Sequence, residues 1–235
     1  MPLVFDVYGT LLDVDAAARK VAAENPNFKE HWADVSAAWR QRQLSYSWLR
    51  SLMGNYVDFW QVTQDSLDVT LAEMRAETAG KGLDDQGLRQ QLLDLYFTLP
   101  AYDEVKGQLQ ALKRAGHQLA VLSNGSPQML KAGLASAGID GLLDKVLSVD
   151  VLGIYKPDPK VYAMVLDAYG CKASDVTFFS SNNWDIAGAG SFGFKTIWVN
   201  RAGKTWDDLP EKPHHIVRSL AEAVNLLDAE SPIEK

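Results

Sequence analysis

The first thirteen residues, Met1 to Asp13, read MPLVFDVYGTLLD and decide the fold class. Leu3 to Phe5 form a short apolar run with a central β-branched valine, which predicts a buried strand. Asp6 follows this run directly, and Gly9 and Thr10 supply a tight turn with a hydroxyl group just beyond it. Because ligands of open parallel sheets gather at the carboxyl ends of the strands, Asp6 is a candidate functional residue. A helix cap or a solvated turn acid would show the same local pattern.

Further along the chain, buried-strand patterns alternate with helical patterns. The strand patterns span residues 118–123, 145–149, 176–179 and 195–199. The helical patterns span residues 105–115, 127–137, 159–169 and 185–192, and several are followed by glycine, which commonly ends a helix. This alternation predicts an α/β protein with a doubly wound, Rossmann-like parallel sheet core.

The segment between the first and second predicted strands is too long for an ordinary crossover and lacks strand alternation. It predicts an inserted helical cap domain, residues 14–97, with the core domain formed by residues 1–13 and 98–235. Helical patterns occupy residues 28–53, 56–74 and 88–97, and the polar stretch 77–86 is expected to be a loop. The first pattern rests on an apolar stripe: Phe28, Trp32, Val35, Trp39, Tyr46, Leu49 and Met53.

Composition excludes several classes of function. The 235 residues carry a net charge of −7 and are 47% hydrophobic, which argues for a globular protein and against a broad nucleic-acid or membrane-binding surface. The single cysteine, Cys171, excludes an intrachain disulfide and a multi-cysteine metal site. The N-terminal residues lack the pattern of a signal peptide, so we expect a cytoplasmic protein without nucleic-acid or membrane partners.

Three other predicted strands also end in polar side chains. Ser123 and Asn124 precede Gly125 and Ser126 in a loop typical of an anion cradle, although turns and N-caps show the same residues. Lys156 lies in the proline-stiffened segment KPDP and would otherwise be a surface lysine. Residues 180–185 read SSNNWD and end in Asp185 at an expected helix start. The simpler alternative is that this acid only caps the helix. Together with Asp6, these groups are expected to converge on one site.

The four motifs FDVYGT, LSNGS, YKPDP and SSNNWD resemble, in this order, those of the haloacid dehalogenase superfamily. The resemblance implies a nucleophilic Asp6, and in most members it implies magnesium-dependent phosphoryl transfer. Two positions that are acidic in those members are here Tyr8 and Ser181. Magnesium prefers carboxylate-containing oxygen ligation, so the departure disfavours metal binding, and we expect no cofactor.

Residues 38–53 are similar to the L-2-haloacid dehalogenase branch of that superfamily through Ala38-Trp39-Arg40 and the residues that follow. The resemblance implies that Arg40 binds halide. Helical spacing supports this role, because Arg40, Leu44 and Trp48 are four residues apart and share one face. An arginine that only extends its charged end into solvent is the alternative.

The resemblance implies hydrolysis of short-chain (S)-2-haloacids to (R)-2-hydroxyacids through an ester on Asp6, with inversion. The positive charge of Lys156 would keep Asp6 ionised. Asp185 would activate the hydrolytic water, Asn182 and Ser180 would position it, and Tyr162 would support Lys156. The expected catalytic residues are Asp6, Thr10, Arg40, Lys156, Ser180, Asn182 and Asp185. The expected substrate-binding residues are Ser123, Asn124, Leu44, Phe59, Tyr162 and Trp184.

Other functions stay open at this point. One is a magnesium-dependent small-molecule phosphatase, and another is a hydrolase that opens a strained heterocycle bearing a 2-carboxylate. A non-catalytic binding protein on the same fold is the third. For the dehalogenase, the expected partners are a small 2-haloalkanoic acid and a halide ion, and family analogy adds a homodimer.

Overall fold

The computed structural model describes residues 1–78 and 86–230. Its strands are β1 (Pro2–Phe5), β2 (Gln118–Ser123), β3 (Lys145–Ser148), β4 (Thr177–Ser180), β5 (Lys195–Val199) and β6 (His215–Val217). Its α-helices are α1 (Ala16–Glu24), α2 (Trp32–Met53), α3 (Phe59–Glu77), α4 (Gln86–Tyr96), α5 (Val105–Arg114), α6 (Pro127–Ser136), α7 (Pro159–Tyr169), α8 (Asn183–Phe192) and α9 (Leu220–Glu230). Short 3-10 turns are η1 (Asp140–Leu142), η2 (Val149–Val151) and η3 (Ala173–Asp175).

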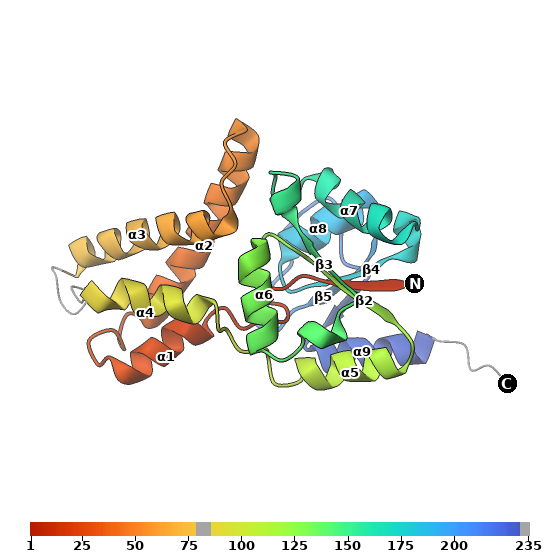
Figure 1. Cartoon of the computed structure of the whole chain (residues 1–235), viewed down its shortest axis with the longest axis horizontal. Coiled ribbons are helices and arrows are strands. Elements are labelled where there is room, and N and C mark those ends of the chain that lie inside the picture. The colour runs from red at the N-terminus through yellow and green to blue at the C-terminus, as the bar shows by residue number, and fades with distance from the viewer. Residues whose placement is uncertain (79–85, 231–235) are drawn as a thin grey trace.

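These strands form one parallel sheet in the order β3-β2-β1-β4-β5-β6. Helices α7 and α8 lie on the opposite side of the sheet from α5 and α9 (Figure 1). Apolar side chains bury both faces of the central strands, and Phe5 stacks on Phe179 with ring centroids 4.6 Å apart. The predicted doubly wound parallel sheet is confirmed.

The order of the strands places β1 at the centre, where the direction of winding reverses. Phe5 pairs with Val121 of β2 on one side and with Phe179 of β4 on the other. Asp6 is therefore the first residue beyond β1 at the point where crossover helices diverge to opposite faces, and a crevice forms there in folds of this kind.

Helices α1 to α4, which we call the cap helices, lie together to one side of the sheet (Figure 1). Two chain segments join them to the sheet, and these segments run next to each other. The Asp13 amide donates to the Pro100 carbonyl oxygen at 2.9 Å, and the Tyr102 amide donates to the Leu11 carbonyl oxygen at 3.1 Å. The chain thus leaves and re-enters the core at adjacent points, as the predicted insertion requires.

The apolar stripe predicted on α2 is wrong at its C-terminal end. Leu49 and Met53 are exposed, at 51% and 62%, whereas the polar residues Gln43 and Ser47 are buried. Burial of these polar groups is tolerated because they are hydrogen-bonded. The Gln43 side-chain amide donates to Thr63 Oγ1 of α3 at 2.9 Å, and the Ser47 hydroxyl donates to the Leu44 carbonyl oxygen at 2.8 Å.

Other differences from expectation concern boundaries and short elements. Phe28 precedes α2 and is buried outside it, and strand β6 and helices α1 and α9 were not expected. Of the expected loop 77–86, Glu77 ends α3 and Gln86 begins α4, and residues 79–85 lie outside the described part. In the described ranges, no helix combines the length and apolar character that crossing a bilayer requires.

Candidate active site

The Asp6 carboxylate lies at the carboxyl end of β1 and is almost buried, with 8% of its side chain exposed. Its two oxygens have different surroundings. Oδ2 accepts hydrogen bonds from Thr10 Oγ1 at 2.9 Å, from Asn182 Nδ2 at 2.9 Å and from Ser180 Oγ at 3.5 Å. Oδ1 accepts one from Lys156 Nζ at 3.2 Å. The structure therefore holds this carboxylate in one orientation, with three donors on one oxygen and a cation on the other.

Lys156 is fully buried, and its ammonium group bridges two carboxylates. Nζ lies 3.2 Å from Asp6 Oδ1 and 2.9 Å from Asp185 Oδ2. Burial by itself would lower the pKa of Lys156, but Asp185 and Asp6 together raise it above its ordinary value. Its backbone amide donates to Asn124 Oδ1 at 3.0 Å, which ties this segment to the end of β2. Lys156 is thus a permanent cation beside Asp6 and not a surface lysine.

Asp185 lies in the first turn of α8 and is also fully buried. Burial raises its pKa to about 6, Asp6 shifts this pKa in the same direction, and Lys156 and Tyr162 oppose the shift. The helix begins after Asn182, and Asp185 points into the site without capping the helix. Its carboxyl group can therefore change protonation state near neutral pH, which is the property expected of a catalytic acid or base.

The position of Tyr162 shows how it relates to Lys156. Its hydroxyl donates to Asp185 Oδ1 at 2.9 Å, and no bond joins it to Lys156 in the described structure. Tyr162 is buried, and it reaches the ammonium group only through Asp185. The reason is geometric, since α7 carries Tyr162 against α8, where Asp185 lies. Tyr162 is thus a direct partner of Asp185, and its link to Lys156 passes through that carboxylate.

The loop after β2 is held rigidly by its own hydrogen bonds. Ser123 Oγ accepts from the Gly125 amide at 3.1 Å, and Ser148 Oγ donates to the Gly125 carbonyl oxygen at 2.7 Å. Ser126 caps α6 through a bond from the Met129 amide at 3.4 Å. Ser123 and Asn124 are buried, and Asn124 connects to the Asp6 cluster through the Lys156 backbone.

Arg40 and Leu44 approach the site from α2 and are half-buried. Arg40 Nη2 lies 3.5 Å from the Tyr8 carbonyl oxygen, which also accepts a bond from Asn182 Nδ2 at 3.4 Å. Arg40, Leu44 and Asn182 line a cavity of about 530 Å³ between α2 and the strand ends. Since Asn182 also contacts Asp6, this cavity borders the nucleophile candidate.

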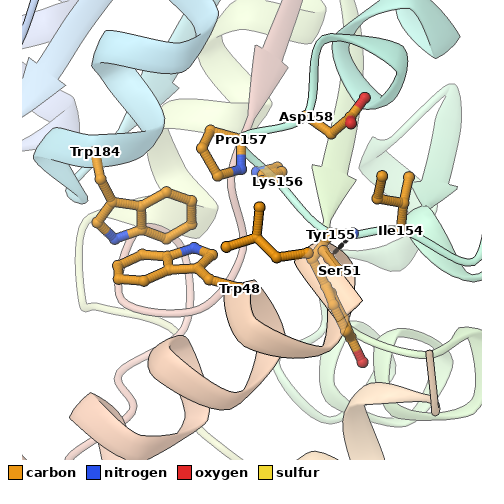
Figure 2. A pocket seen from close by; sticks show the side chains of 9 residues that line it. Trp48, Ser51, Ile154, Tyr155, Lys156, Pro157, Asp158 and Trp184 are labelled. Atoms are coloured by element: carbon orange, nitrogen blue, oxygen red, sulfur yellow. Dashed lines mark hydrogen bonds between the residues drawn. The ribbon is translucent and has the colours of Figure 1, made fainter. Parts of the chain in front are cut away.

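The aromatic residues expected at the site have separate positions. Phe59 is buried, and its ring centroid lies 6.1 Å from that of Tyr8. Trp184 forms an edge contact with Trp48 of α2, with centroids 5.4 Å apart. Both tryptophans line a second cavity of about 480 Å³, with Lys156 and Pro157 (Figure 2). Trp184 of α8 thus connects the core to the cap through Trp48, which lies one helical turn beyond Leu44 on α2.

Tyr8 and Ser181 stand at the two positions that are acidic in the superfamily whose motifs the sequence resembles, and neither supplies a carboxylate. The Tyr8 ring fills the space beside Gly125, where an added Cβ would lie 2.7 Å from Tyr8 Cε2. Ser181 Oγ donates to the Gly9 carbonyl oxygen and lies 3.0 Å from Thr10 Oγ1. No group of three or more His, Cys, Asp or Glu residues suited to a metal ion occurs in residues 1–78 and 86–230. These side chains do not fit a magnesium site, which needs clustered oxygen ligands including carboxylates.

Sequence reasoning did not find Arg201, which follows β5 and contacts the Thr10 carbonyl oxygen at 3.0 Å. It belongs to none of the four motifs, and the only signal in the sequence is its place just beyond a predicted strand.

Comparisons with known proteins agree on one family. The family model for haloacid dehalogenase-like hydrolases matches residues 3–193. The chain is 46% identical over 224 residues to (S)-2-haloacid dehalogenase 1 of Pseudomonas sp. (strain CBS-3), covering 95% of each chain. It is 44% identical to (S)-2-haloacid dehalogenase 4A of Burkholderia cepacia, covering 95% of this chain and 93% of that one.

Solved structures give the same result. A dehalogenase crystal structure with an intermediate complex superposes with a TM-score of 0.89 at 42% identity, covering 96% of both chains. The L-2-haloacid dehalogenase from Xanthobacter autotrophicus with chloropropionic acid covalently bound superposes with a TM-score of 0.85 at 33% identity, covering 98% of this chain and 99% of that one.

Proposed function

This chain belongs to the haloacid dehalogenase-like hydrolases, in the L-2-haloacid dehalogenase branch, and we propose that it hydrolyses short-chain (S)-2-haloacids to (R)-2-hydroxyacids through an ester on Asp6. The observation that carries the proposal is the asymmetric environment of the Asp6 carboxylate, with one oxygen beside a buried cation and the other bound by three donors. Several relatives of this length are named (S)-2-haloacid dehalogenases, which supports the reaction class.

The substrate carboxylate binds at the loop after β2, through Ser123 and neighbouring backbone amides. Asn124 Oδ1 is already bonded to the Lys156 amide, so Asn124 offers its Nδ2 donor to the substrate. Backside attack requires the halogen to point away from Asp6, toward α2. Arg40 contacts the Tyr8 carbonyl oxygen on that side, and Phe59 packs against the Tyr8 ring. The guanidinium group of Arg40 supplies charge-assisted hydrogen bonds to the departing halide.

Asp6 Oδ1 is the attacking oxygen. A bond forms between Oδ1 and the α-carbon while the carbon–halogen bond breaks, and the halide leaves with the bonding electron pair. The configuration of the α-carbon inverts. Both the nucleophile and the substrate are anions, and the Lys156 ammonium group 3.2 Å from Oδ1 offsets their repulsion. This cation also allows the step to proceed without a metal ion.

Hydrolysis of the ester uses the other oxygen. Water attacks Cγ of Asp6, and the negative charge that develops on Oδ2 is stabilised by Thr10, Asn182 and Ser180. One donor placed in this way contributes about 3 kcal/mol to a transition state, or roughly a hundredfold in rate. Asp185 accepts one proton of the water and returns it to Oδ1 as the Cγ–Oδ1 bond breaks, while the bond between Oδ1 and the α-carbon stays intact. This cleavage releases the hydroxyacid, and loss of the second proton of the water to solvent restores the carboxylate.

The alternative functions are not favoured. A magnesium phosphatase needs the two acids that Tyr8 and Ser181 replace. The Tyr8 ring packs beside Gly125, and the Ser181 hydroxyl donates to the Gly9 carbonyl oxygen. Opening of a strained ring would use the same Asp6 attack but would need no halide site at Arg40.

The deciding assay measures halide release from L- and D-2-chloropropionate after extensive EDTA treatment. We expect release from the L enantiomer alone, with the D hydroxyacid as product. Absence of halide together with magnesium-dependent cleavage of phosphate esters would overturn the proposal. A single turnover in heavy-oxygen water should place the label in Asp6, and label found only in the product would contradict the ester.

We also propose a homodimer. The C-terminal end of α2 presents Leu52 and Met53 to solvent, at 84% and 62% exposure, a suitable apolar surface for a second copy. Light scattering on the eluting protein measures its mass, and a monomer at micromolar concentration would contradict the dimer.

A further inference from the structure

Arg201 lies just beyond β5, where the two segments that join core and cap helices meet the sheet. Its Nη2 donates to the Thr10 carbonyl oxygen at 3.0 Å, and its Nη1 forms an ion pair with Glu104. The guanidinium carbon lies 3.9 Å from the centre of the Tyr102 ring. One side chain therefore holds the segment that carries Thr10 and the segment that carries Tyr102 and Glu104.

Glu104 is itself fixed in place. It precedes α5, and its Oε1 also accepts a bond from the Leu220 amide at the start of α9, at 3.3 Å. Burial by itself would raise the pKa of Glu104, but Arg201 and backbone amides hold this pKa below its ordinary value. The acid therefore stays ionised at neutral pH and keeps the guanidinium group in its position.

The importance of Thr10 comes from its two roles. Its hydroxyl donates to Asp6 Oδ2 at 2.9 Å and accepts from the Ser181 amide at 2.9 Å. Its carbonyl oxygen is the atom that Arg201 binds. A shift of this backbone would move the hydroxyl away from the oxygen on which charge develops during ester hydrolysis.

We propose that Arg201 is a positioning residue for the dehalogenation, because its grip on the Thr10 carbonyl oxygen keeps the threonine hydroxyl on Asp6 Oδ2. The proposal rests on the function proposed above, since halide release is its readout. Arg201 also lines the cavity of about 530 Å³ beside Arg40, and the proposal assigns its guanidinium group to Thr10 and Glu104 and not to the substrate.

The test is a double-mutant cycle between Arg201→Gln and Thr10→Val. In the wild-type background, we expect Arg201→Gln to lower kcat by about tenfold or more, the effect of removing a charged hydrogen bond. KM should change by less than about threefold, because the guanidinium group of Arg201 is held by Thr10, Glu104 and the Tyr102 ring and only lines the cavity. A larger rise in KM would indicate a direct contact with the substrate and would contradict a purely positioning role. In the Thr10→Val background, the same substitution should lower kcat by less than about twofold, since the hydroxyl it positions is absent.

The matched control is Lys113→Gln, which breaks an ion pair of similar construction away from the site. Lys113 lies on α5 and pairs with Asp144 at 2.7 Å, and Asp144 also accepts a backbone amide, from Leu119. Urea unfolding should show that both substitutions destabilise the fold, and that only Arg201→Gln lowers kcat. Arg201→Lys keeps the charge beside Glu104, so its kcat should lie between those of Arg201→Gln and the wild type. If Arg201→Gln does not fold, Arg201→Lys takes its place in the cycle.

If the wild-type protein releases halide, two results would overturn the positioning role of Arg201 and leave the proposed function standing. One is an equal loss of kcat from Arg201→Gln in both backgrounds, and the other is a loss no greater than that of Lys113→Gln. A wild-type protein that releases no halide from L-2-chloropropionate would instead overturn the proposed function, and this proposal with it.

Discussion

The two sides of the site differ in how deeply their residues are buried and in whether they border a cavity. On the core side, Asp6, Lys156 and Asp185 are buried and joined by short hydrogen bonds to one another and to Asn182 and Thr10. On the cap side, the face of α2 with Arg40, Leu44 and Trp48 is half-buried and borders cavities of about 530 and 480 Å³. The core side sets the charges for the reaction, whereas the cap side shapes a space that a substrate can fill.

If this division is correct, the largest effect should come from the nucleophile. Asp6→Asn replaces the carboxylate with an amide that cannot attack carbon, and we expect kcat to fall by roughly ten-thousandfold. Halide release measures the loss, and mass spectrometry of the quenched protein should detect no ester. A loss smaller than about a hundredfold would place the nucleophile elsewhere, unless the mass shows that the introduced amide has been hydrolysed back to a carboxylate.

On the cap side we expect a smaller loss of turnover, and the loss should differ between Arg40 and Arg50 of the same helix. Arg40→Lys keeps the charge but loses the planar donors toward the halide, and we expect turnover to fall by about a hundredfold. Arg50→Lys is the control on the same helix, because Arg50 pairs with Asp65 at 2.9 Å and lines neither cavity. Equal losses in the two variants would remove the halide role from Arg40.

The pH dependence of kcat tests whether Asp185, on the core side, acts as the base that accepts a proton from water. Its pKa of about 6 means that the carboxyl group is protonated below pH 6 and ionised above it. A protonated Asp185 cannot accept a proton from water, so kcat should fall by about tenfold per pH unit on the acid side. This fall should begin at or below pH 6, because the ester on Asp6 removes a negative charge that raises the pKa of Asp185. Asp185→Asn should lower kcat and remove this limb of the profile. A profile that keeps its acidic limb in Asp185→Asn would assign the titration to another group.

The smallest effect expected is on stability and concerns the packing of Tyr8. In Gly125→Ala the added methyl group would lie 2.7 Å from Tyr8 Cε2, and we expect overpacking to lower the free energy of unfolding by about 1–3 kcal/mol. Gly107→Ala is the control, because Gly107 lies within α5 with no atom within 4 Å of the added Cβ, and alanine favours helix by up to about 1 kcal/mol. Urea unfolding measures both changes. A neutral Gly125→Ala would show that the Tyr8 ring can move.

The sequence predicted the sheet well because each central strand is a continuous apolar run between turn residues, as in Gln118–Ser123. Strand β6 was missed because three residues at a sheet edge carry little pattern. The error on α2 has another cause. Hydrophobic periodicity counts Gln43 and Ser47 as surface residues, and only the partner helix shows that they are hydrogen-bonded and buried.

The strand-end rule and the family motifs brought together the polar residues around Asp6, since parallel strands end at one edge of a sheet. They could not predict which donors bind which oxygen, or that Tyr162 bonds to Asp185 and not to Lys156. These details depend on the positions of α7 and α8. The contact between Arg201 and Thr10 depends on the packing of segments almost two hundred residues apart in the chain. No local pattern in the sequence indicates such a contact.

The adjacent points at which the chain leaves and re-enters the core have an evolutionary consequence. The Asp13 amide and the Pro100 carbonyl oxygen are 2.9 Å apart, so the inserted segment that carries the cap helices starts and ends at one place on the sheet. Replacement of that segment would change the substrates that are admitted and leave the strands that hold Asp6 intact. Enzymes that act on different substrates can in this way inherit one set of buried charges.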